Sequence, residues 1–349
     1  MDTNIVYMDK KHIDMQELER AGALIKRGEL VAFPTETVYG LGGDALQEAS
    51  AQKIYAAKGR PSDNPLIIHI AKWEDIYYIC KDIPEVAKKL ADAFWPGPLT
   101  MILKKADVVP LATTGGLDTV AVRLPGHEVA RAFIEAAGGY VAAPSANISG
   151  RPSPTLAKYV YEDMKGKIPL IIDGGEVGIG VESTIVDLTE EVPVILRPGY
   201  ITREMLEEIL GQVTNDATMM ESLKDVAPKA PGMKYRHYAP KGSLAIVAGD
   251  TDAVIKYINE ACREAIKEGK RTGVLCTSET GDCYTADCVK CIGSRADEST
   301  VAQGLYKVLR ECDDEGLEVL FAESFHTEGI GQAIMNRLLK AAGHHVIQV

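Results

Sequence analysis

The sequence predicts a mixed α/β protein of two domains, and three observations support this fold class. The chain has 349 residues, which is more than a single hydrophobic core usually organises. Residues 30–200 combine several helices with more strands than a regular βαβ alternation contains, which favours a mixed, twisted, partly open sheet. From residue 243 onward the alternation of strand and helix becomes regular, which predicts a small three-layer α/β domain.

The first domain is expected to span residues 1–211. An apolar stripe at helical spacing and a closing glycine predict a helix over 13–28. Short apolar runs stopped by proline or glycine predict the strands, and longer periodic runs predict the helices. Helices are expected over 50–57, 83–94, 128–137 and 203–211, and strands over 30–33, 66–68, 99–103, 120–124, 140–143, 169–173, 183–187 and 194–197. The last two strands are expected to pair.

Residues 212–241 are expected to connect the domains, and residues 242–349 to form the second one. The connecting segment holds several prolines, which predict an extended, semi-rigid chain. Its Tyr235-Arg236-His237-Tyr238 run is compatible with a passive linker or with a lid over an anion or a base. In the second domain we expect strands over 244–247, 273–276, 289–292 and 318–321, and helices over 252–268, 299–312 (capped by Ser299) and 330–342.

Composition and charge restrict the function classes. The content of 46% hydrophobic and 25% charged residues is typical of a soluble globular protein, and no apolar run is long enough to span a bilayer. The beginning of the chain does not resemble a signal peptide, so we expect a cytoplasmic protein. Residues 1–200 carry 21 Lys and Arg against 27 Asp and Glu, and residues 201–349 carry 17 against 23, so each part has a net charge of −6. Bulk electrostatics therefore argue against a basic nucleic-acid module.

Seven cysteines, an odd number, argue against a disulfide framework. Cys288 and Cys291 form one close pair, with Cys276 and Cys283 nearby. A structural zinc site usually needs two such pairs, so free thiols are favoured over zinc.

The stretch from Lys58 to His69 places two cations before a Pro-Ser-Asp-Asn-Pro bend and an apolar run. Pro61 and Pro65 remove two backbone donors, which predicts a helix, a rigid bend and a buried strand. Lys58 and Arg60 at such a bend suit a carboxylate or phosphate ligand. Taken alone, the stretch is explained at least as well by a basic helix C-terminus that complements the helix dipole.

The polar residues that follow strands in the first domain are mostly cations and hydroxyls. Cysteine–histidine pairs, Ser-His-Asp sets and carboxylate pairs do not stand out among them. Strict alternation also places Arg123 on the strand face opposite Val120 and Val122. Such a set suits carboxylate and polyphosphate ligands, with catalysis by positioning and electrostatics as in nucleotidyl transfer with Mg²⁺.

Several blocks resemble those of the YrdC/Sua5 family. They are Lys58-x-Arg60 with Ser145-x-Asn147, Pro34-Thr-Glu-Thr-Val-Tyr-Gly-Leu-Gly42, Asn64-Pro-Leu, Glu182-Ser-Thr-Ile-Val-Asp187 and Arg197-Pro-Gly199. The extension after residue 231 is similar to the two-domain Sua5 type. The resemblance implies a concave cavity on the first sheet and a Rossmann-like second domain.

The resemblance also implies an L-threonylcarbamoyl-AMP synthase, a nucleotidyltransferase that condenses L-threonine, bicarbonate or CO₂, and ATP, with Mg²⁺, and releases pyrophosphate. Its product would pass to proteins that modify the adenosine next to the tRNA anticodon, with tRNA itself bound at most weakly. Two alternatives remain open at this point, an RNA-binding module without catalysis and a carbamoyl-transfer domain.

The resemblance assigns residue roles by position. Lys58 and Arg60 would be catalytic. Threonine would contact Thr37, His69, Arg123, Ala143 and Ser183. ATP would contact Arg60, Asn64, Thr119, Ser145, Asn147, Ser153, Arg197, Tyr235 and Arg236. No protein ligand set for a metal is expected.

Overall fold

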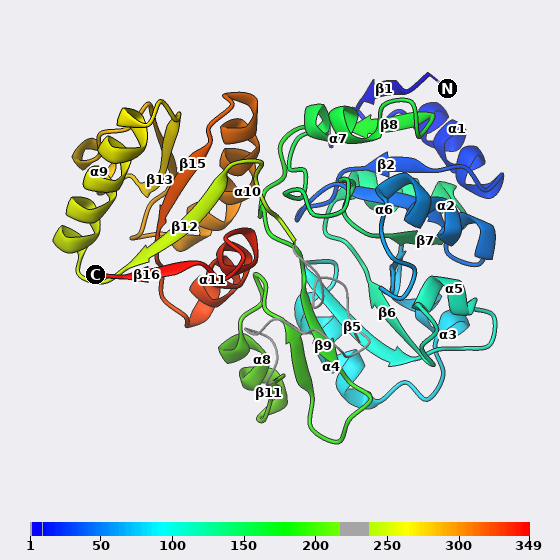
Figure 1. The fold of residues 1–349 in the computed structure, drawn as a ribbon. Coiled ribbons are helices and arrows are strands. Elements are labelled where there is room, and N and C mark those ends of the chain that lie inside the picture. Colours follow the sequence, from blue (N-terminus) through cyan, green and yellow to red (C-terminus); the bar gives the residue numbers. More distant parts are fainter. Residues whose placement is uncertain (1, 9, 217–236) are drawn as a thin grey trace. The chain divides into compact units, whose positions relative to one another are not determined.

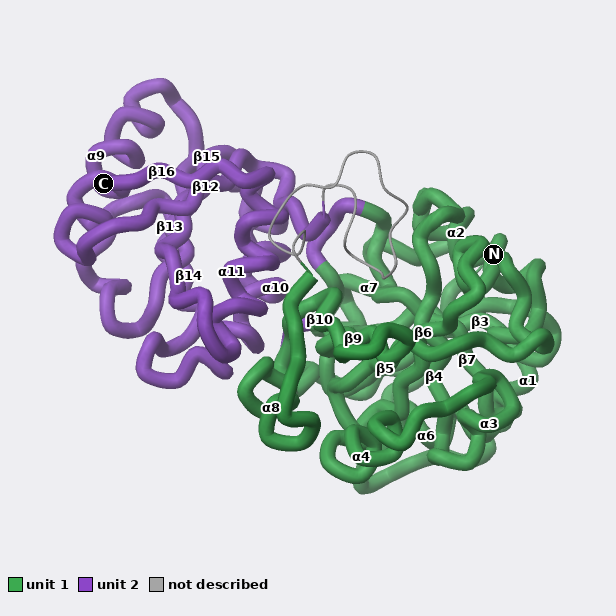
Figure 2. Tube along the Cα trace, turned by 90° about the horizontal axis from the view of Figure 1, so that it is seen from below, with its two compact units in different colours: residues 1–149, 153–178, 182–235 green, residues 150–152, 179–181, 236–349 purple. Residues whose placement is uncertain are grey.

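The chain divides into two compact units in the computed structural model, which describes residues 2–8, 10–216 and 237–349. Unit 1 comprises residues 1–149, 153–178 and 182–235, and unit 2 comprises residues 150–152, 179–181 and 236–349 (Figure 2). Within unit 2, the buried guanidinium of Arg310 donates from Nε and Nη2 to the carbonyl of Pro152 at 3.0 and 2.7 Å. No helix of the described residues is long and apolar enough to cross a membrane.

Unit 1 is built on an eleven-stranded mixed sheet (Figure 1). Its strands lie in the order β1-β8-β2-β3-β7-β4-β6-β5-β9-β10-β11. They are β1 (Asn4–Tyr7), β2 (Val31–Phe33), β3 (Gly40–Asp44), β4 (Ile67–Ile70), β5 (Leu99–Lys104), β6 (Thr119–Arg123), β7 (Tyr140–Ala143), β8 (Leu170–Asp173), β9 (Thr184–Asp187), β10 (Val194–Arg197) and β11 (Thr214–Asn215). The predicted mixed sheet is confirmed, and so is the antiparallel pairing of β9 with β10.

The helices of unit 1 are short and cover the sheet. They are α1 (Met15–Lys26), α2 (Glu48–Lys58), α3 (Ile76–Ile79), α4 (Glu85–Phe94), α5 (Leu111–Thr114), α6 (Glu128–Ala136), α7 (Ala157–Met164) and α8 (Arg203–Leu210), with a 3₁₀ turn at Trp73–Asp75. Helices α1 and α6 enclose a core with β2 and β8 around Phe33 and Phe133, whose ring centroids lie 5.1 Å apart. A larger core under α2, α4 and α7 includes Ile68, Met101 and Val122.

Strand register divides the central strands into a core face and a polar face. Ile68 opposes Val122 in the parallel pair β4–β6, and Met101 opposes Val122 in the antiparallel pair β5–β6. These three side chains belong to the main core. Because side chains alternate along a strand, His69 and its partner Arg123 point to the opposite face. The sequence prediction for Arg123 is therefore confirmed.

Unit 2 is a parallel five-stranded sheet in the order β14-β13-β15-β12-β16 with helices on both faces (Figure 1). Its elements are β12 (Ser243–Ala248), α9 (Thr251–Lys267), β13 (Thr272–Thr277), a 3₁₀ turn (Gly281–Cys283), β14 (Cys288–Gly293), α10 (Glu298–Asp314), β15 (Val319–Glu323), α11 (Gly329–Ala341) and β16 (Val346–Gln348). Helix α9 packs on a core that includes Val247, Ile258 and Phe321. The predicted three-layer domain is confirmed.

Two local predictions differ from the structure. Gly40–Asp44 forms strand β3, antiparallel to β2, and this segment is not among the predicted strands. These glycines are needed because a Cβ at Gly42 would lie 2.8 Å from a methyl of Val141. Helix α10 is capped by Asp297, whose Oδ1 accepts from Ser299 N at 3.1 Å and from Ser299 Oγ at 2.6 Å, so Ser299 is not the cap.

Helix α10 packs closely on β14 at Gly304. A Cβ at this position would lie 2.1 Å from the carbonyl oxygen of Ile292. Alanine normally stabilises an exposed helix by about 1 kcal/mol relative to glycine. We expect Gly304→Ala to lower the free energy of unfolding instead, by about 1–3 kcal/mol, because the helix must shift away from the sheet. Urea unfolding followed by circular dichroism measures this change, with Glu264→Ala on α9 as a surface control. An increase in stability would contradict the close packing.

Candidate active site

The guanidinium of Arg123 is fixed on the polar face of the sheet by three contacts. Its Nη1 donates to Thr37 Oγ1 at 2.9 Å, its Nη2 to Glu36 Oε1 at 2.6 Å and its Nε to the carbonyl of Gly97 at 3.3 Å. The Arg123 side chain is 4% exposed and that of Glu36 17%. Burial would raise the pKa of Glu36, but the positive charge of Arg123 outweighs burial, and the pKa lies below its ordinary value. Both groups are therefore charged near neutral pH.

His69 lies beside Arg123 on the neighbouring strand β4. Burial, together with the charge of Arg123, lowers the pKa of His69 to about 3. Its Nδ1 lies 3.2 Å from the carbonyl of Ile67, which suits a neutral ring that donates from Nδ1. Its Nε2 is then the atom with a lone pair, so the ring offers an uncharged acceptor next to a cation.

A second fixed guanidinium lies at the end of β10. Arg197 donates from Nε to the carbonyl of Ser183 at 3.0 Å and from Nη2 to Ser183 Oγ at 3.1 Å. Ser183 Oγ also lies 2.7 Å from Thr100 Oγ1. Arg197 opposes Ile185 and Thr100 opposes Ile185, so both side chains lie on the polar face. Two arginines and two hydroxyls thus share one face of the sheet.

Lys58, the last residue of α2, is buried. Its Nζ donates to the carbonyls of Ser145 and Asn147 at 2.5 and 2.6 Å and to Asn147 Oδ1 at 3.3 Å. The N–H of Ser149 in turn donates to the Lys58 carbonyl at 2.9 Å. The helix ends at Gly59, which has the left-handed φ of 62°. Lys58 therefore joins the two predicted motifs, Lys58-x-Arg60 and Ser145-x-Asn147, into one substructure.

Arg60 and Asn64 form the bend that follows α2. Arg60 Nη2 donates to the carbonyl of Pro65 at 3.2 Å. Asn64 is fully buried, yet neither its Oδ1 nor its Nδ2 has a hydrogen-bond partner in the part of the chain that the structure describes. Leaving a buried amide unsatisfied costs about 1–3 kcal/mol, and such groups are rare. A ligand that supplies a donor and an acceptor would compensate this cost.

The segment after β2 links these clusters. Tyr39 N donates to the carbonyl of Pro154 at 2.9 Å, and Ala146 N donates to the carbonyl of Tyr39 at 2.8 Å. Ser153, which directly precedes Pro154, is fully buried, and its Oγ donates to Glu182 Oε1 at 2.6 Å. The loop that contacts Arg123 therefore also contacts the loop that carries Ser145, Asn147 and Ser153.

The structure thus brings together two groups of the predicted residues. One group comprises Thr37, His69, Arg123 and Ser183 with Arg197, and the other comprises Lys58, Ser145 and Asn147. Thr119 begins β6 on the face of Arg123, and Ala143 ends β7 opposite Ile67. Tyr235 and Arg236 lie outside the described residues.

Sequence reasoning did not single out Glu36, Thr100 or Glu182. Each is the buried or half-buried partner of a predicted residue, namely of Arg123, Ser183 and Ser153. Glu36 and Glu182 do lie within the family-like segments 34–42 and 182–187, and no other feature of the sequence indicated them. Thr100 had none, because it stands within an apolar strand.

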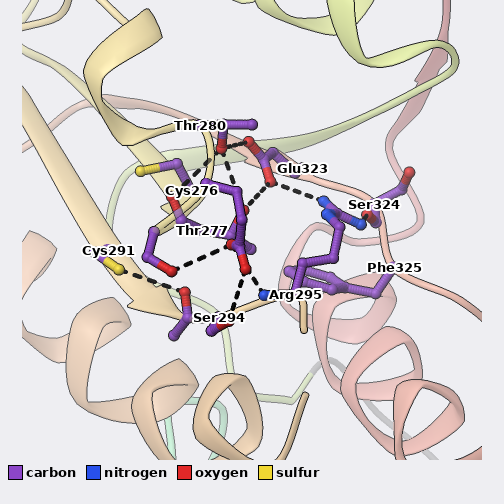
Figure 3. Close-up of polar contacts among 12 residues, drawn as sticks. Cys276, Thr277, Thr280, Cys291, Ser294, Arg295, Glu323, Ser324 and Phe325 are labelled. Carbon is purple, nitrogen blue, oxygen red and sulfur yellow. Dashed lines mark hydrogen bonds and ion pairs between the residues drawn. The ribbon is translucent and has the colours of Figure 1, made fainter. Parts of the chain in front are cut away.

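Unit 2 contains a separate polar cluster at the carboxyl ends of β13, β14 and β15 (Figure 3). Glu323 accepts from Thr277 Oγ1 at 3.2 Å, Tyr284 Oη at 2.8 Å and Arg295 Nη2 at 2.8 Å, and also from Thr280. All of these donors belong to unit 2 itself, so the cluster explains the stability of that edge without a ligand. Among the described residues, no three His, Cys, Asp or Glu side chains gather as a metal site, and all seven cysteines are free thiols.

The fold and the site define an α/β protein in which buried arginines and hydroxyls gather on one face of a mixed sheet. Family models agree with this description. Residues 23–199 match the Sua5/YciO/YrdC model, described as telomere recombination, and residues 201–343 match the C-terminal domain of threonylcarbamoyl-AMP synthase. The chain belongs to the Sua5/YrdC family and has the two-domain Sua5 form.

Full-length relatives support this assignment. The chain is 49% identical to the threonylcarbamoyl-AMP synthase of Pyrococcus abyssi, over 99% of both chains. It is 48% identical to that of Bacillus subtilis, over 95% of this chain and 94% of the relative. The crystal structure of P. abyssi Sua5 complexed with L-threonine matches with a TM-score of 0.93 and 48% identity, covering 100% of both chains.

The lowered pKa of His69 makes a prediction about stability. In the unfolded chain this ring takes up a proton near pH 6.5, whereas in the folded protein it stays neutral down to about pH 3. Its contribution to stability is therefore complete above pH 6.5 and is lost as the pH falls toward 3, with a slope of up to about 1.4 kcal/mol per pH unit.

We expect His69→Asn to reduce the loss of unfolding free energy between pH 7 and pH 5, compared with the parent protein. Urea unfolding at both pH values measures the difference. The exposed His344→Asn serves as the control for removing a histidine from the surface. Equal pH dependence in the parent and His69→Asn would contradict a neutral, buried His69.

Proposed function

We propose that the protein is an L-threonylcarbamoyladenylate synthase. It condenses L-threonine, bicarbonate or CO₂, and ATP into threonylcarbamoyl-AMP and pyrophosphate. The full-length similarity to threonylcarbamoyl-AMP synthases carries this proposal. The polar face described above supports it, because one part of that face suits an amino acid and another suits a nucleotide. No described feature favours the RNA-binding or carbamoyl-transfer alternatives.

Threonine occupies the part of the face around Arg123. The guanidinium is charged and held in place by Thr37 and Glu36, so it takes the α-carboxylate without reorganising. His69 is neutral and can accept a hydrogen bond from the threonine hydroxyl through Nε2. Ser183, fixed by Arg197 and Thr100, adds a further hydroxyl. Ala143 and the start of β4 form the boundary of this end of the site.

ATP occupies the region around the Lys58 substructure, at the loop that follows β7. Arg60 and Arg197 provide the cations for the phosphates, and Ser145, Asn147 and Ser153 provide hydroxyl and amide groups. Asn64, with both amide atoms available, offers a donor and an acceptor to the nucleotide. Thr119 and the segment around Tyr235 and Arg236 complete the proposed ATP contacts.

Mg²⁺ enters with ATP in this proposal. The described residues near the phosphates are cations, hydroxyls and amides, and they do not form a set of three acidic or histidine ligands. That composition fits Mg²⁺ held mainly by phosphate oxygens and water, as is usual for this ion. When bound, Mg²⁺ supplies positive charge to the phosphates.

The chemistry proceeds in two steps. The threonine amine, after losing its ammonium proton, forms a bond from nitrogen to the carbon of CO₂ and releases a second proton, which gives a carbamate. A carbamate oxygen then bonds to the α-phosphorus of ATP, and the bond to pyrophosphate breaks. Arg60 stabilises the charge that develops on the phosphates, and Lys58 fixes the loop that faces them.

The product would pass to proteins that transfer the threonylcarbamoyl group to tRNA. The protein itself would act in the cytoplasm and bind tRNA at most weakly, because both halves of the sequence carry a net negative charge.

The proposed reaction predicts which substrates are required. We expect pyrophosphate release from ATP and Mg²⁺ only when both L-threonine and bicarbonate are present. A coupled pyrophosphate assay with single omissions measures this requirement. Equal release without threonine would contradict the proposed function.

The proposed phosphate contact predicts the effect of removing Arg60. We expect Arg60→Ala to lower kcat/KM for ATP by about 100-fold, because one electrostatic contact to the transition state is lost. The threonine dissociation constant should change little. Arg203→Ala, which removes an exposed arginine of α8, is the matched control and should retain activity. A normal kcat/KM for ATP in Arg60→Ala would contradict a catalytic role for Arg60.

A further inference from the structure

The carboxylate of Glu36 is only partly explained by its contact with Arg123. Its Oε1 accepts from Arg123 Nη2 at 2.6 Å, but its Oε2 is buried and has no hydrogen-bond partner among the described residues. The backbone N–H groups of Gly126 and of Glu36 itself also lower the pKa of this carboxyl, but they do not give Oε2 a hydrogen bond of good geometry. A buried carboxylate oxygen without a donor is costly, and such an atom needs an explanation. A clamp that only orients Arg123 needs one oxygen, so the second oxygen is available to a ligand.

Arg123 has donors in reserve in the same place. A guanidinium carries five N–H groups. Contacts with Gly97, Thr37 and Glu36 use three of them, and the other two make no hydrogen bond within residues 2–8, 10–216 and 237–349. The pair therefore presents free donors on a cation beside a free acceptor on an anion. An α-amino acid carries the complementary groups, a carboxylate and an ammonium attached to the same α-carbon.

The charge balance favours the same ligand. Glu36 and Arg123 together are neutral, and the adjacent His69 is uncharged because burial lowers its pKa to about 3. A purely anionic ligand at Arg123 would face the Glu36 carboxylate and be repelled. A zwitterion would pair with both charges, and each charge-assisted contact would be strengthened by burial.

We propose that Glu36 binds the α-ammonium group of threonine through Oε2 while Arg123 binds the α-carboxylate. This inference rests on the proposed function and adds Glu36 to the threonine site as a residue that positions the amine and selects free α-amino acids. The hydroxyl of threonine is left to His69 and Ser183. Glu36 thus orients the α-nitrogen of threonine before that nitrogen reacts with CO₂.

Isothermal titration calorimetry on the full chain tests the inference with two probes, L-threonine and 2,3-dihydroxybutanoate, which has a hydroxyl in place of the ammonium. The parent protein should bind threonine at least tenfold more tightly than the deaminated probe. Glu36→Gln should weaken threonine binding by at least tenfold. It should not weaken binding of the deaminated probe and should strengthen it if anything, because the substitution also removes the repulsion between the Glu36 carboxylate and an anionic ligand.

Glu182→Gln is the matched control, since Glu182 is a buried carboxylate bound to Ser153 on the nucleotide side. This substitution should weaken the binding of ATP and leave the affinity for threonine within threefold of the parent value. Retained ATP binding shows that Glu36→Gln is folded. Should that variant not fold, Glu36→Asp, which keeps the charge, must still prefer threonine to the deaminated probe.

Three outcomes would overturn the inference. They are equal affinities of the parent protein for both probes, unchanged threonine binding in Glu36→Gln, and equal losses for both probes in that variant. The last of these would make Glu36 a clamp for Arg123 only. If the parent protein binds no threonine at all, the proposed function fails together with the inference, and this result is distinct from the other three.

Discussion

The buried ammonium of Lys58 is the constraint on which the site depends. Removing a lysine charge from water costs several kcal/mol, and this cost must be offset by good hydrogen bonds. The carbonyls of Ser145 and Asn147 provide them, and each charge-assisted bond contributes about 1.5–3 kcal/mol. The end of α2 and the loop after β7 are far apart in the sequence, and Lys58 keeps them together. The bend that carries Arg60 and Asn64 begins directly after Lys58, so its starting position is fixed.

Local charge placement explains how a protein with a net charge of −12 can bind anions. The cations of the site are not part of a basic surface. Arg123 and Arg197 are buried and each is held by several acceptors, so they keep their geometry when no ligand is present. Fixed charges in a poorly hydrated place interact more strongly than mobile surface charges do. The neutral His69 avoids placing a second positive charge beside Arg123.

The sequence predicted most of the elements, because their signals are local. Apolar periodicity, glycine stops and proline breaks located the longer helices and the central strands, and alternation placed Arg123 on the correct face. The prediction was weaker where the structure depends on distant contacts. Strand β1 has four residues and exists through its pairing with β8, more than 160 residues away in the chain. Strand β3 is rich in glycine for steric reasons that only its neighbours Phe33 and Val141 reveal.

The site shows the same division between local and distant information. The motifs identified which cations and hydroxyls to consider, since these residue types follow strands at recognisable spacing. They could not identify the partners that fix them, because Glu36, Thr100 and Glu182 become neighbours of Arg123, Ser183 and Ser153 only after the sheet has formed. A carboxylate next to an arginine is usually counted as neutralising it. In this protein the buried, unsatisfied second oxygen of Glu36 changes that conclusion, since the pair retains capacity for a ligand that carries both charges.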